Sequence, residues 1–470
     1  MTAPRASDVP APTRRICQRL RAAGHEAYVV GGCVRDLLLG RSAADWDVAT
    51  SALPEAVQAL FRRSIPTGLQ HGTITVLDGD TQVEVTTFRS EGAYADGRHP
   101  DRVTFGVTLD EDLARRDFTV NALAFDPETE RLVDPHGGQR DLAARLLRAV
   151  GDPVARLCED GLRVMRAARF AATLEFELDP ATEAAIPAAL GSLARVSQER
   201  VRDELVKLLG ARTPSRGLGI LARSGALAVI LPELAEGIGQ VQNRYHHHDV
   251  WTHTMATVDA TPAGDPPDPV RRLSALLHDV AKPRTAAPRE DAPGEFTFYR
   301  HDLVGAELSE TILRRLRVSN RERERVVAVV AHHMFWYTPE WTDSAVRRFV
   351  AKVGEGLLPD LFALREGDVV GRGRGEDPDV ELGELRARIG RVLEEDQALT
   401  VGDLAIKGGD VITALALRPG PVVGELLRAL LELVLEDPSL NDRDRLLALL
   451  PEVHANGLTN VHATRAKNLP

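Results

Sequence analysis

The feature that most constrains the fold of this chain is a change in its hydrophobic pattern near residue 142. Before this point, short apolar runs such as Glu26–Val30 end in glycine turns, which is typical of strands that lead into helices. After it, apolar residues recur at helical spacing, for example over 162–174 and 199–209. Strands must pair in a sheet to be buried, whereas helices can pack on one another. The pattern therefore predicts an α+β chain, with an N-terminal α/β head built on a mixed sheet and an all-α remainder.

The length of 470 residues is too great for one hydrophobic core, so about three or four units are expected. We predict a head over 13–148, a helical neck over 149–245, a second helical domain over 246–370 and a helical tail over 380–452. The Pro- and Ala-rich residues 1–12 and the polar residues 453–470 are predicted to be disordered. Further strands are predicted over 72–77 and 82–88, and further helices over 13–23, 34–39 and 216–224.

Composition limits the cellular compartment in which the protein is expected and the partners that it can bind. The three cysteines have neither disulfide nor zinc spacing, and no apolar run reaches about 18 residues, so we expect a cytoplasmic protein without a membrane anchor. The net charge of -11 argues against nucleic acid binding only if it is evenly spread. Arginines gather at 115–116 and 156–169, whereas acid gathers at 376–395. A basic stripe can therefore bind RNA, although ordinary surface ion pairs are the alternative.

The strongest local motif is Gly31-Gly32-Cys33-Val34-Arg35-Asp36, followed by Asp45-Trp46-Asp47. The glycines allow close approach of a phosphate, so Gly32 and Arg35 are predicted to bind a triphosphate. Asp45 and Asp47 are two apart, so on a strand both carboxylates face the same side and can hold Mg²⁺. These two aspartates are the predicted catalytic and metal-binding residues.

Two further segments complete the predicted head site. Glu84 is the candidate third catalytic carboxylate, although an outward-facing strand residue is an equal alternative, so the identity of the third carboxylate stays open. In Arg115-Arg116-Asp117-Phe118-Thr119-Val120-Asn121-Ala122, Arg116 is predicted to bind phosphates, and Asp117 and Asn121 to bond a ribose or organise the loop. The alternative is that Asp117 and Asn121 only cap a helix.

The order of these motifs resembles that of bacterial class II CCA-adding tRNA nucleotidyltransferases and of the related bacterial poly(A) polymerases. The resemblance runs from about Ala27 to Leu209 and continues more loosely to about Leu450. It implies template-independent addition of CMP, CMP and AMP to the 3′ end of tRNA, with CTP and ATP as substrates and two Mg²⁺ ions in the head. It does not imply an oligomeric state.

Glu159-Asp160-Gly161-Leu162-Arg163 resembles the E-D-x-x-R element of this family, and Arg166 and Arg169 follow at the same spacing. Helical residues three apart share a face, so Asp160 and Arg163 are expected to point the same way. Cytosine and adenine both offer an amino group beside a ring nitrogen, which suit a carboxylate acceptor and a guanidinium donor. Asp160 and Arg163 are therefore predicted to select the base, and Arg166 and Arg169 to bind phosphates or orient that pair. Ordinary Asp–Arg pairing on a charged helix is the alternative.

Two segments bear on which nucleotides are added. Residues 67–73 resemble the corresponding segment of CCA-adding enzymes, and residues 89–101 resemble the flexible loop that CC-only enzymes lack. Addition of A alone and poly(A) addition stay open as alternatives within the same family.

In the second helical domain, His253, His278-Asp279 and Asp368 resemble the ligand set of HD phosphohydrolases. Imidazoles and carboxylates suit a divalent ion such as Mn²⁺, Ni²⁺ or Mg²⁺. His301 and either His332 or His333 are candidates for binding phosphate or a second ion. We expect a secondary phosphohydrolase activity on RNA ends or nucleotides. The two other classes left open are a protein that is mainly such a hydrolase and an RNA-binding module without catalysis.

Overall fold

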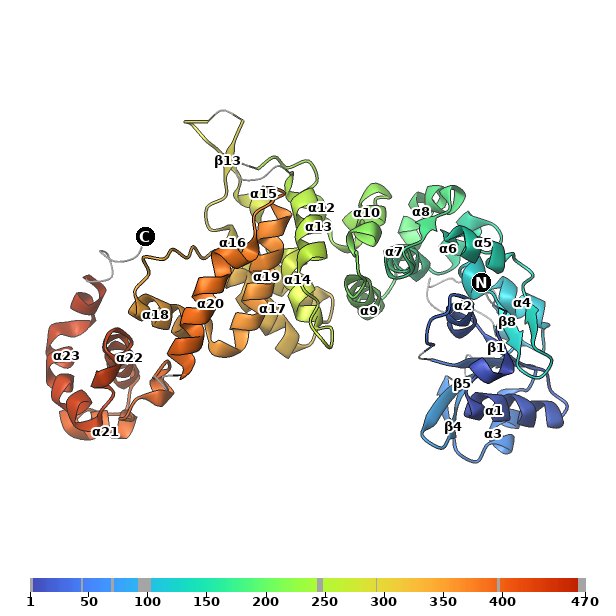
Figure 1. Ribbon diagram of the computed structural model, residues 1–470, viewed down its shortest axis with the longest axis horizontal. Helices are drawn as coiled ribbons and strands as arrows, with labels where there is room; N and C mark the ends of the chain where they lie inside the picture. The colour runs from blue at the N-terminus through green and yellow to red at the C-terminus, as the bar shows by residue number, and fades with distance from the viewer. Residues whose placement is uncertain are drawn as a thin grey trace. The chain divides into compact units, whose positions relative to one another are not determined.

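The computed structural model describes residues 3–463 with gaps at 44, 69–71, 92–102, 243–247, 293 and 395–397. Two compact units account for the chain. The first unit comprises Met1–Gln240, Asp249–Asp259 and Glu310–Asn320, and the second comprises Val241–His248, Ala260–Ser309 and Arg321–Pro470. Figure 1 shows the first unit at its blue and green end, where all the strands of the large sheet lie.

The head is built on a seven-stranded sheet in the order β3-β4-β5-β2-β1-β8-β9. Its strands are β1 (Ala27–Val30), β2 (Asp47–Thr50), β3 (Ser64–Gly68), β4 (Thr73–Asp78), β5 (Thr81–Thr87), β8 (Ala124–Asp126) and β9 (Arg131–Val133). β2 and β5 pair in parallel, and the other neighbours pair antiparallel. The prediction of a mixed sheet is confirmed. The parallel pair matters most, because its register places Asp47 opposite Glu84.

Short helices surround this sheet. They are α1 (Ala11–Ala22), α2 (Gly32–Leu38), α3 (Pro54–Leu60), α4 (Leu109–Ala114), η3 (Thr119–Asn121) and α5 (Gly138–Ala144). The short strands β6 (Arg89–Glu91) and β7 (Val103–Phe105) pair antiparallel beside them. Residues 3–12, where disorder was expected, instead contain a 3-10 helix at Ala6–Asp8 and the start of α1. Val9 is fully buried, so packing of this apolar side chain fixes the segment.

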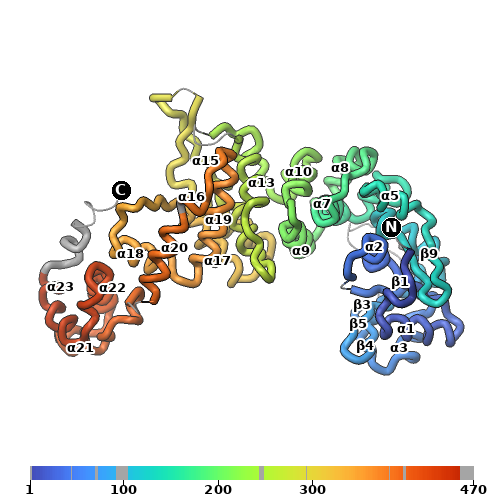
Figure 2. Tube along the Cα trace, in the orientation of Figure 1, coloured from blue at the N-terminus to red at the C-terminus, as the bar shows by residue number. Residues whose placement is uncertain are grey.

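The neck is helical, as predicted (Figure 2). Its helices are α6 (Pro153–Glu159), α7 (Leu162–Leu174), α8 (Pro180–Leu193), α9 (Gln198–Leu209), α10 (Ser215–Arg223), α11 (Ala226–Ile230) and α12 (Pro232–Ala235). The helix α13 (Val250–Ala260) lies within the predicted second helical domain, but the first unit contains it up to Asp259. Gly161 separates α6 from α7 and lies against the end of α8. A Cβ atom at Gly161 would lie 2.2 Å from the backbone nitrogen of Leu193, so only glycine fits this contact.

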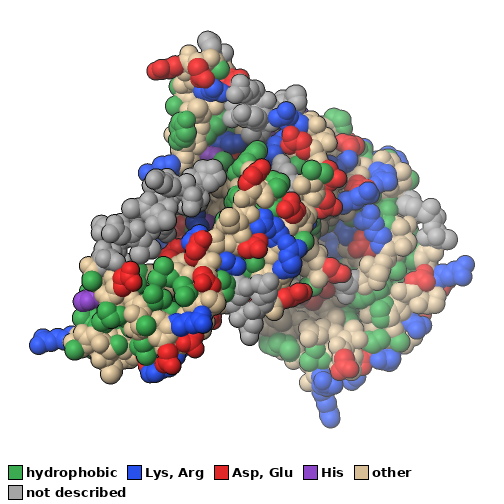
Figure 3. All heavy atoms as spheres, turned by 60° about the vertical axis from the view of Figure 1, so that its left-hand side comes forward, with side chains coloured by type: hydrophobic (Ala, Val, Ile, Leu, Met, Phe, Trp, Pro, Cys, Tyr) green, Lys and Arg blue, Asp and Glu red, His purple; other side chains and the backbone are tan. Residues whose placement is uncertain are grey.

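The second unit is also helical. Its elements are α14 (Pro269–Leu277), α15 (Lys282–Thr285), α16 (His301–Arg315, of which 310–315 belong to the first unit), α17 (Asn320–His332), α18 (Asp343–Val353), α19 (Leu358–Gly371), α20 (Pro378–Glu394), α21 (Gly408–Leu415), α22 (Pro421–Glu436) and α23 (Arg443–Ala463). Charged side chains of both signs are interspersed over the face that Figure 3 brings forward. Among the described residues, no helix is long and apolar enough to cross a membrane.

The boundaries in the second unit differ from the predicted ones. The expected linker over 370–380 shrinks to 372–377, because α19 continues to Gly371 and α20 starts at Pro378. In the tail, Leu430, Leu446 and Leu450 are buried in one apolar cluster. Since α23 contributes to this cluster, the helix is anchored and continues to Ala463, past the residue where disorder was predicted to begin.

Candidate active site

A cavity of about 620 Å³ lies in the first unit and is lined by head and neck residues together. The lining residues are Gly31, Gly32, Cys33, Arg35, Asp36, Asp45, Asp47, Arg89, Arg115, Arg116, Asp117, Asn121, Asp160, Leu162, Arg163, Arg166, Arg169, Phe170 and Arg200. Of the head and neck residues that the sequence singled out as site residues, only Glu84 is absent from this lining.

The carboxylates of the head gather where β2 and β5 run parallel. Asp47 is the first residue of β2, and Asp45 is exposed just before it. Burial raises the pKa of Asp47 to about 6, with a further rise from the charges of Glu84 and Asp45 that Arg116 only partly offsets. Glu84 is exposed, and its charge acts on Asp47 from the neighbouring strand. Three acidic groups that repel one another fit a site for divalent cations.

Gly31 and Arg116 form the adjoining wall. Gly31 has φ +82°, and a Cβ atom on it would lie 2.9 Å from Nη1 of Arg116, so this position favours glycine both for its backbone and for the close approach. Arg116 pairs with Asp112 at 3.4 Å. Its Nε is buried and has no hydrogen-bond partner among the described residues. An unsatisfied guanidinium donor beside carboxylates fits the binding of an anionic group such as a phosphate.

The side chain of Arg35 makes more hydrogen bonds within the protein than the sequence suggested. Its guanidinium bonds both carboxylate oxygens of Asp36 at 2.9 and 3.0 Å and donates to Oδ1 of Asn121 at 2.7 Å. It also lies 5.3 Å from the ring centre of Phe170. Because a guanidinium has five N–H donors, donors remain for a ligand, but Arg35 also ties α2 to η3.

A buried ionic network joins the head to the neck. The carboxylate of Asp117 accepts from Nδ2 of Asn121 at 3.1 Å and from Nε of Arg166 at 2.7 Å. Burial acts to raise the pKa of Asp117, but Arg166 and Asn121 outweigh it and lower this pKa to about 2. Glu204 of α9 accepts in turn from Nε of Arg169 at 2.5 Å. Arg166 is therefore held by a carboxylate of the head, and Arg169 is held by a carboxylate of the neck.

The predicted geometry of the base-selecting pair is wrong in one respect. Asp160 is not on the same helix as Arg163, because it caps the end of α6 with extended backbone (φ -137°, ψ 107°), and Gly161 then starts α7. Asp160 pairs with Arg200 of α9, with Nη2 2.7 Å from Oδ2. Both Asp160 and Arg163 nevertheless line the cavity that also holds Asp45 and Asp47.

Arg163 is held in place by acceptors on two segments. Its Nη1 donates to Oε2 of Glu159 at 2.5 Å, and its Nη2 donates to the carbonyl of Arg115 at 3.1 Å. Since Arg115 ends α4, Arg163 reaches from the neck to the head.

Sequence reasoning missed three residues of this cavity. Arg200, Phe170 and Arg89 line it, although none belongs to the motifs that were singled out as sites. Phe170 has the guanidinium of Arg169 over its ring at 3.9 Å, and those of Arg35 and Arg166 at 5.3 and 5.2 Å. Its place one residue after Arg169 was the only local signal.

The two segments that were expected to report on the nucleotides added are only partly described. In 67–73, residues 69–71 lie outside the described residues, as do residues 92–101 of the predicted flexible loop. The described start of that loop pairs with β7, with Arg89 opposite Phe105.

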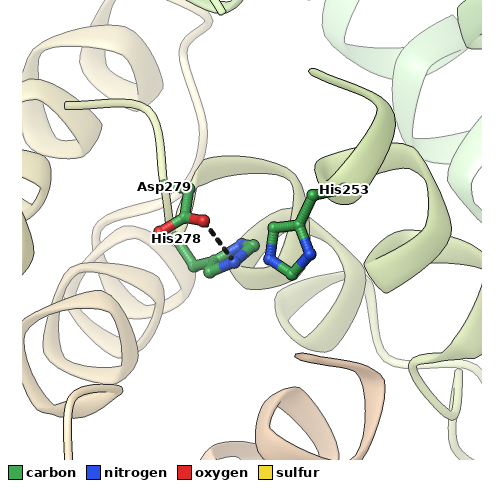
Figure 4. A group of neighbouring side chains, drawn as sticks. All are labelled: His253, His278 and Asp279. Atoms are coloured by element: carbon green, nitrogen blue, oxygen red, sulfur yellow. Dashed lines mark ion pairs between the residues drawn. The ribbon is translucent and has the colours of Figure 1, made fainter. Parts of the chain in front are cut away.

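A second group of polar residues is buried in the second unit. His278 and Asp279 follow α14, His301 begins α16 and His333 follows α17. Nε2 of His278 lies 3.2 Å from Oδ2 of Asp279, and Nε2 of His301 lies 3.4 Å from Oδ1. Figure 4 draws the pair of His278 and Asp279, together with His253.

The other predicted ligands of the HD-type set are placed as follows. Asp368, on α19, has Oδ1 3.9 Å from Nε2 of His278, while its Oδ2 pairs with Arg365 and Arg372 at 3.3 and 3.1 Å. His253 is buried on α13 and belongs to the first unit. Burial, with His301 and His278, lowers the pKa of His333 to about 3.

Carboxylates at a parallel strand pair, beside a cavity lined with arginines, define the class of the head: it is a nucleotidyltransferase domain. Residues 27–148 match the family model of the poly A polymerase head domain. Residues 175–238 match the probable RNA and SrmB-binding site of polymerase A, and 246–373 match the HD domain.

Relatives extend this match over most of the chain. The chain is 40% identical over 422 residues to an A-adding tRNA nucleotidyltransferase of Deinococcus radiodurans, covering 86% of this chain and 91% of that protein. It is 36% identical over 438 residues to a CCA-adding enzyme of Geobacillus thermodenitrificans, covering 93% and 95%. The chain therefore belongs to the family of tRNA nucleotidyltransferases that carry a poly(A) polymerase head and an HD domain.

A solved structure supports the same conclusion for the fold. The crystal structure of a Bacillus stearothermophilus CCA-adding enzyme in complex with CTP superposes with a TM-score of 0.73 at 32% identity. The match covers 96% of this chain and 100% of that chain. The predicted α+β class, with a mixed-sheet head and a helical remainder, is confirmed.

Proposed function

We propose that this protein adds CMP, CMP and AMP in turn to the 3′ end of tRNA, with CTP and ATP as substrates and no nucleic acid template. The observation that carries the proposal is the single cavity that unites Asp45 and Asp47 of the head with Asp160 and Arg163 of the neck. The proposed residues for phosphate transfer and the proposed residues for base selection therefore line the same cavity. The names of the relatives in Deinococcus and Geobacillus support this reading.

In this proposal, Asp45, Asp47 and Glu84 hold two Mg²⁺ ions. When bound, Mg²⁺ lowers the pKa of the attacking 3′-hydroxyl and neutralises the leaving pyrophosphate. The buried Nε of Arg116 donates to the triphosphate, whose close approach Gly31 and Gly32 allow. Arg35 supplies its remaining donors and holds Asn121 for the ribose.

Base selection falls to the neck. The carboxylate of Asp160 accepts from the amino group of cytosine or adenine, and the guanidinium of Arg163 donates to the adjacent ring nitrogen. Uracil and guanine present the opposite polarity on that edge, so they leave a buried group unsatisfied, at a cost of about 1–3 kcal/mol. Arg166 and Arg169 bind phosphates from their tethered positions.

The test uses tRNA transcripts that end at the discriminator base, in C, or in CC. Each is incubated with Mg²⁺ and one nucleoside triphosphate at a time, and the products are sequenced. We expect CTP to extend the first two by C only, and ATP to extend the third by one A. Incorporation of UTP or GTP at a comparable rate would contradict the proposed base selection.

Addition of A alone is the second candidate, and the 40% identity to an A-adding relative is the observation that favours it. The same transcripts separate the two. An A-adding enzyme extends only the transcript that ends in CC, and poly(A) synthesis extends it beyond one residue.

The residues that match the HD domain, 246–373, support a further candidate activity, hydrolysis of phosphate esters on RNA ends or nucleotides. His253, His278, Asp279 and Asp368 are its proposed metal ligands. Tyr299 and Trp336, near the buried histidines His301 and His333 in sequence, are 80% and 69% exposed and suit the stacking of a base. Release of p-nitrophenol from bis(p-nitrophenyl) phosphate, with Mn²⁺, Ni²⁺ or Mg²⁺, tests the activity, and no turnover with any of these ions would contradict it.

A further inference from the structure

Phe170 on α7 is an aromatic residue around which arginines of the head and of the neck gather. Three guanidiniums lie close to its ring centroid: that of Arg169 at 3.9 Å, that of Arg166 at 5.2 Å and that of Arg35 at 5.3 Å. Arg35 comes from α2 of the head, whereas the other two precede Phe170 on its own helix. All four residues line the cavity of the first unit. The ring therefore lies where the proposed phosphate-binding arginines of the head and of the neck meet.

The ring of Phe170 is held in a fixed place. The residue is 5% exposed, and its ring meets that of Phe118 edge to face, with centroids 5.9 Å apart and an interplanar angle of 85°. Phe118 is fully buried and leads into η3 of the head. Arg166 lies four residues before Phe170, so both are on the same face of α7. A fixed ring can therefore orient arginine side chains, which are otherwise rich in rotamers.

Each of the three guanidiniums also has a carboxylate partner. The pairs are Arg35 with Asp36, Arg166 with Asp117 and Arg169 with Glu204. A carboxylate takes up N–H donors of its arginine and offsets the charge. The face of an aromatic ring is electron-rich and attracts a cation, but it leaves the in-plane N–H groups of a stacked guanidinium to other acceptors. The ring can thus stabilise three like charges near one another while donors remain for a ligand.

We propose that Phe170 is a positioning residue, whose ring holds Arg35, Arg166 and Arg169 together as one cationic wall for the triphosphate of CTP and ATP. The inference rests on the proposed transfer of nucleotides from CTP and ATP to tRNA, and adds a residue to it. A ring that only filled space between the head and the neck would need no electron-rich face. The two roles therefore differ in how they depend on the electron density of the ring.

The test withdraws electrons from the ring and leaves its size nearly unchanged. Phe170 of the full-length protein is replaced by mono-, di- or trifluorinated phenylalanine through nonsense suppression. Transfer of AMP from ATP to a tRNA transcript that ends in CC is measured with Mg²⁺, and kcat and KM are determined separately. Inorganic tripolyphosphate, which has the phosphates of ATP but neither base nor ribose, is used as a competitor.

We expect the KM for ATP and the inhibition constant of tripolyphosphate to rise with each fluorine, by about 5-fold for the trifluorinated ring. The change in kcat should be smaller than that in KM, because these contacts form when the triphosphate binds, before transfer. The preference for ATP over GTP should stay the same, because the three guanidiniums do not include that of Arg163. Unchanged constants across the series would overturn the proposal.

The same fluorinated residues at Phe125 are the matched control. Phe125 is fully buried in β8, so its ring has the same apolar burial without a place in the cavity lining. We expect neither constant to change in this control series. Equal rises in both series would show a general effect of fluorine on the head and would overturn the specific role of Phe170.

Two further variants test the ring without fluorine. Phe170→Leu keeps an apolar side chain and removes the ring, so it should raise both constants, whereas Phe170→Tyr keeps the ring and should leave them near the wild-type values. Thermal denaturation followed by circular dichroism shows whether each variant folds, and the fluorinated series decides if Phe170→Leu does not.

Failure of the proposed function is distinguished from failure of this inference by a binding measurement. If the unsubstituted protein transfers no nucleotide, the proposed function is wrong. Calorimetry of tripolyphosphate binding in the presence of Mg²⁺ then still tests the ring, because the affinity should fall along the fluorinated series. An affinity that does not depend on fluorination would contradict the inference.

Discussion

The head cavity and the buried histidines of the second unit differ in how their polar groups are held. In the head, Asp45 is exposed, Asp47 is half-buried, and arginines such as Arg116 stand beside them, so the site is open and charged. In the second unit, His301 and His333 are buried and fixed by backbone carbonyls. Carboxylates in an open site suit Mg²⁺, which binds together with substrate phosphates, whereas imidazoles fixed by backbone carbonyls suit transition-metal ions.

The largest expected effect is a loss of nucleotide incorporation at the head, with the second unit unchanged. Asp45→Ala with Asp47→Ala removes two of the three proposed metal carboxylates, so incorporation of CMP and AMP should fall by more than about 1000-fold. Binding of tRNA, measured by gel shift, should change little, because the arginines remain. Near wild-type incorporation would refute the metal role of this pair, and an Asp78→Ala variant, in an exposed pair with Arg15, serves as the matched control.

The second largest expected effect is a loss of stability when the ionic network between head and neck is broken. Asp117→Ala leaves Arg166 without its main partner in a largely buried place, which should cost about 3 kcal/mol in the free energy of unfolding of the first unit. Urea denaturation followed by fluorescence and circular dichroism measures this. Asp117→Asn, which keeps an acceptor, should cost less. If the alanine variant loses no stability, the pair contributes little.

The crowding of carboxylates around Asp47 predicts a pH effect in the absence of metal. The pKa of Asp47 is raised from 3.8 to about 6 in the folded head, so the folded state binds this proton more tightly than the unfolded chain does. Stability should therefore rise as pH falls from about 6 toward 4, by roughly 2–3 kcal/mol relative to Asp47→Asn. Denaturation at a series of pH values measures this difference. This stability difference should become smaller when Mg²⁺ is added. If the difference does not depend on pH, the pKa of Asp47 is not raised by the neighbouring carboxylates.

The smallest expected effect concerns selection of the base. Asp160→Ala removes the acceptor for the amino group of the base, so the preference for CTP over UTP should fall by about 10-fold, with little change in the binding of triphosphate. Competition between the two nucleotides on a tRNA transcript measures the ratio. Arg200→Ala is the informative comparison, because it frees Asp160 without removing it. A preference unchanged in Asp160→Ala would remove this residue from base selection.

The sequence was a good guide to the elements and to the residues of the head. The helix predicted over 162–174 is α7 to the residue, and the strand predicted over 82–88 is β5 shifted by one. Local spacing determines such elements, so local reasoning finds them. It expected both Asp45 and Asp47 on a strand, but only Asp47 lies in β2, and Asp45 precedes the strand.

What could not be predicted depends on contacts between distant segments. Asp160 was expected to share a helix face with Arg163, but it ends α6 before α7 begins and pairs with Arg200, forty residues away. Similarly, Arg163 reaches the carbonyl of Arg115. Sequence periodicity cannot reveal these partners, because they arise from the packing of α9 on α7 and from the hydrogen bond between Arg163 and the residue after α4. The expected disorder of residues 3–12 failed for the same reason, since the burial of Val9 depends on tertiary packing.

Gly161 has a consequence for how far this enzyme can vary. Its neighbours Asp160 and Leu162 both line the cavity, while its own missing side chain lets the chain abut the end of α8. Any larger residue at position 161 would clash with the backbone of Leu193 and displace Asp160 and Leu162 together. The positions of Asp160 and Leu162 in the cavity wall thus depend on the absence of a side chain at Gly161, so we expect low tolerance to mutation at a residue that does not itself line the cavity.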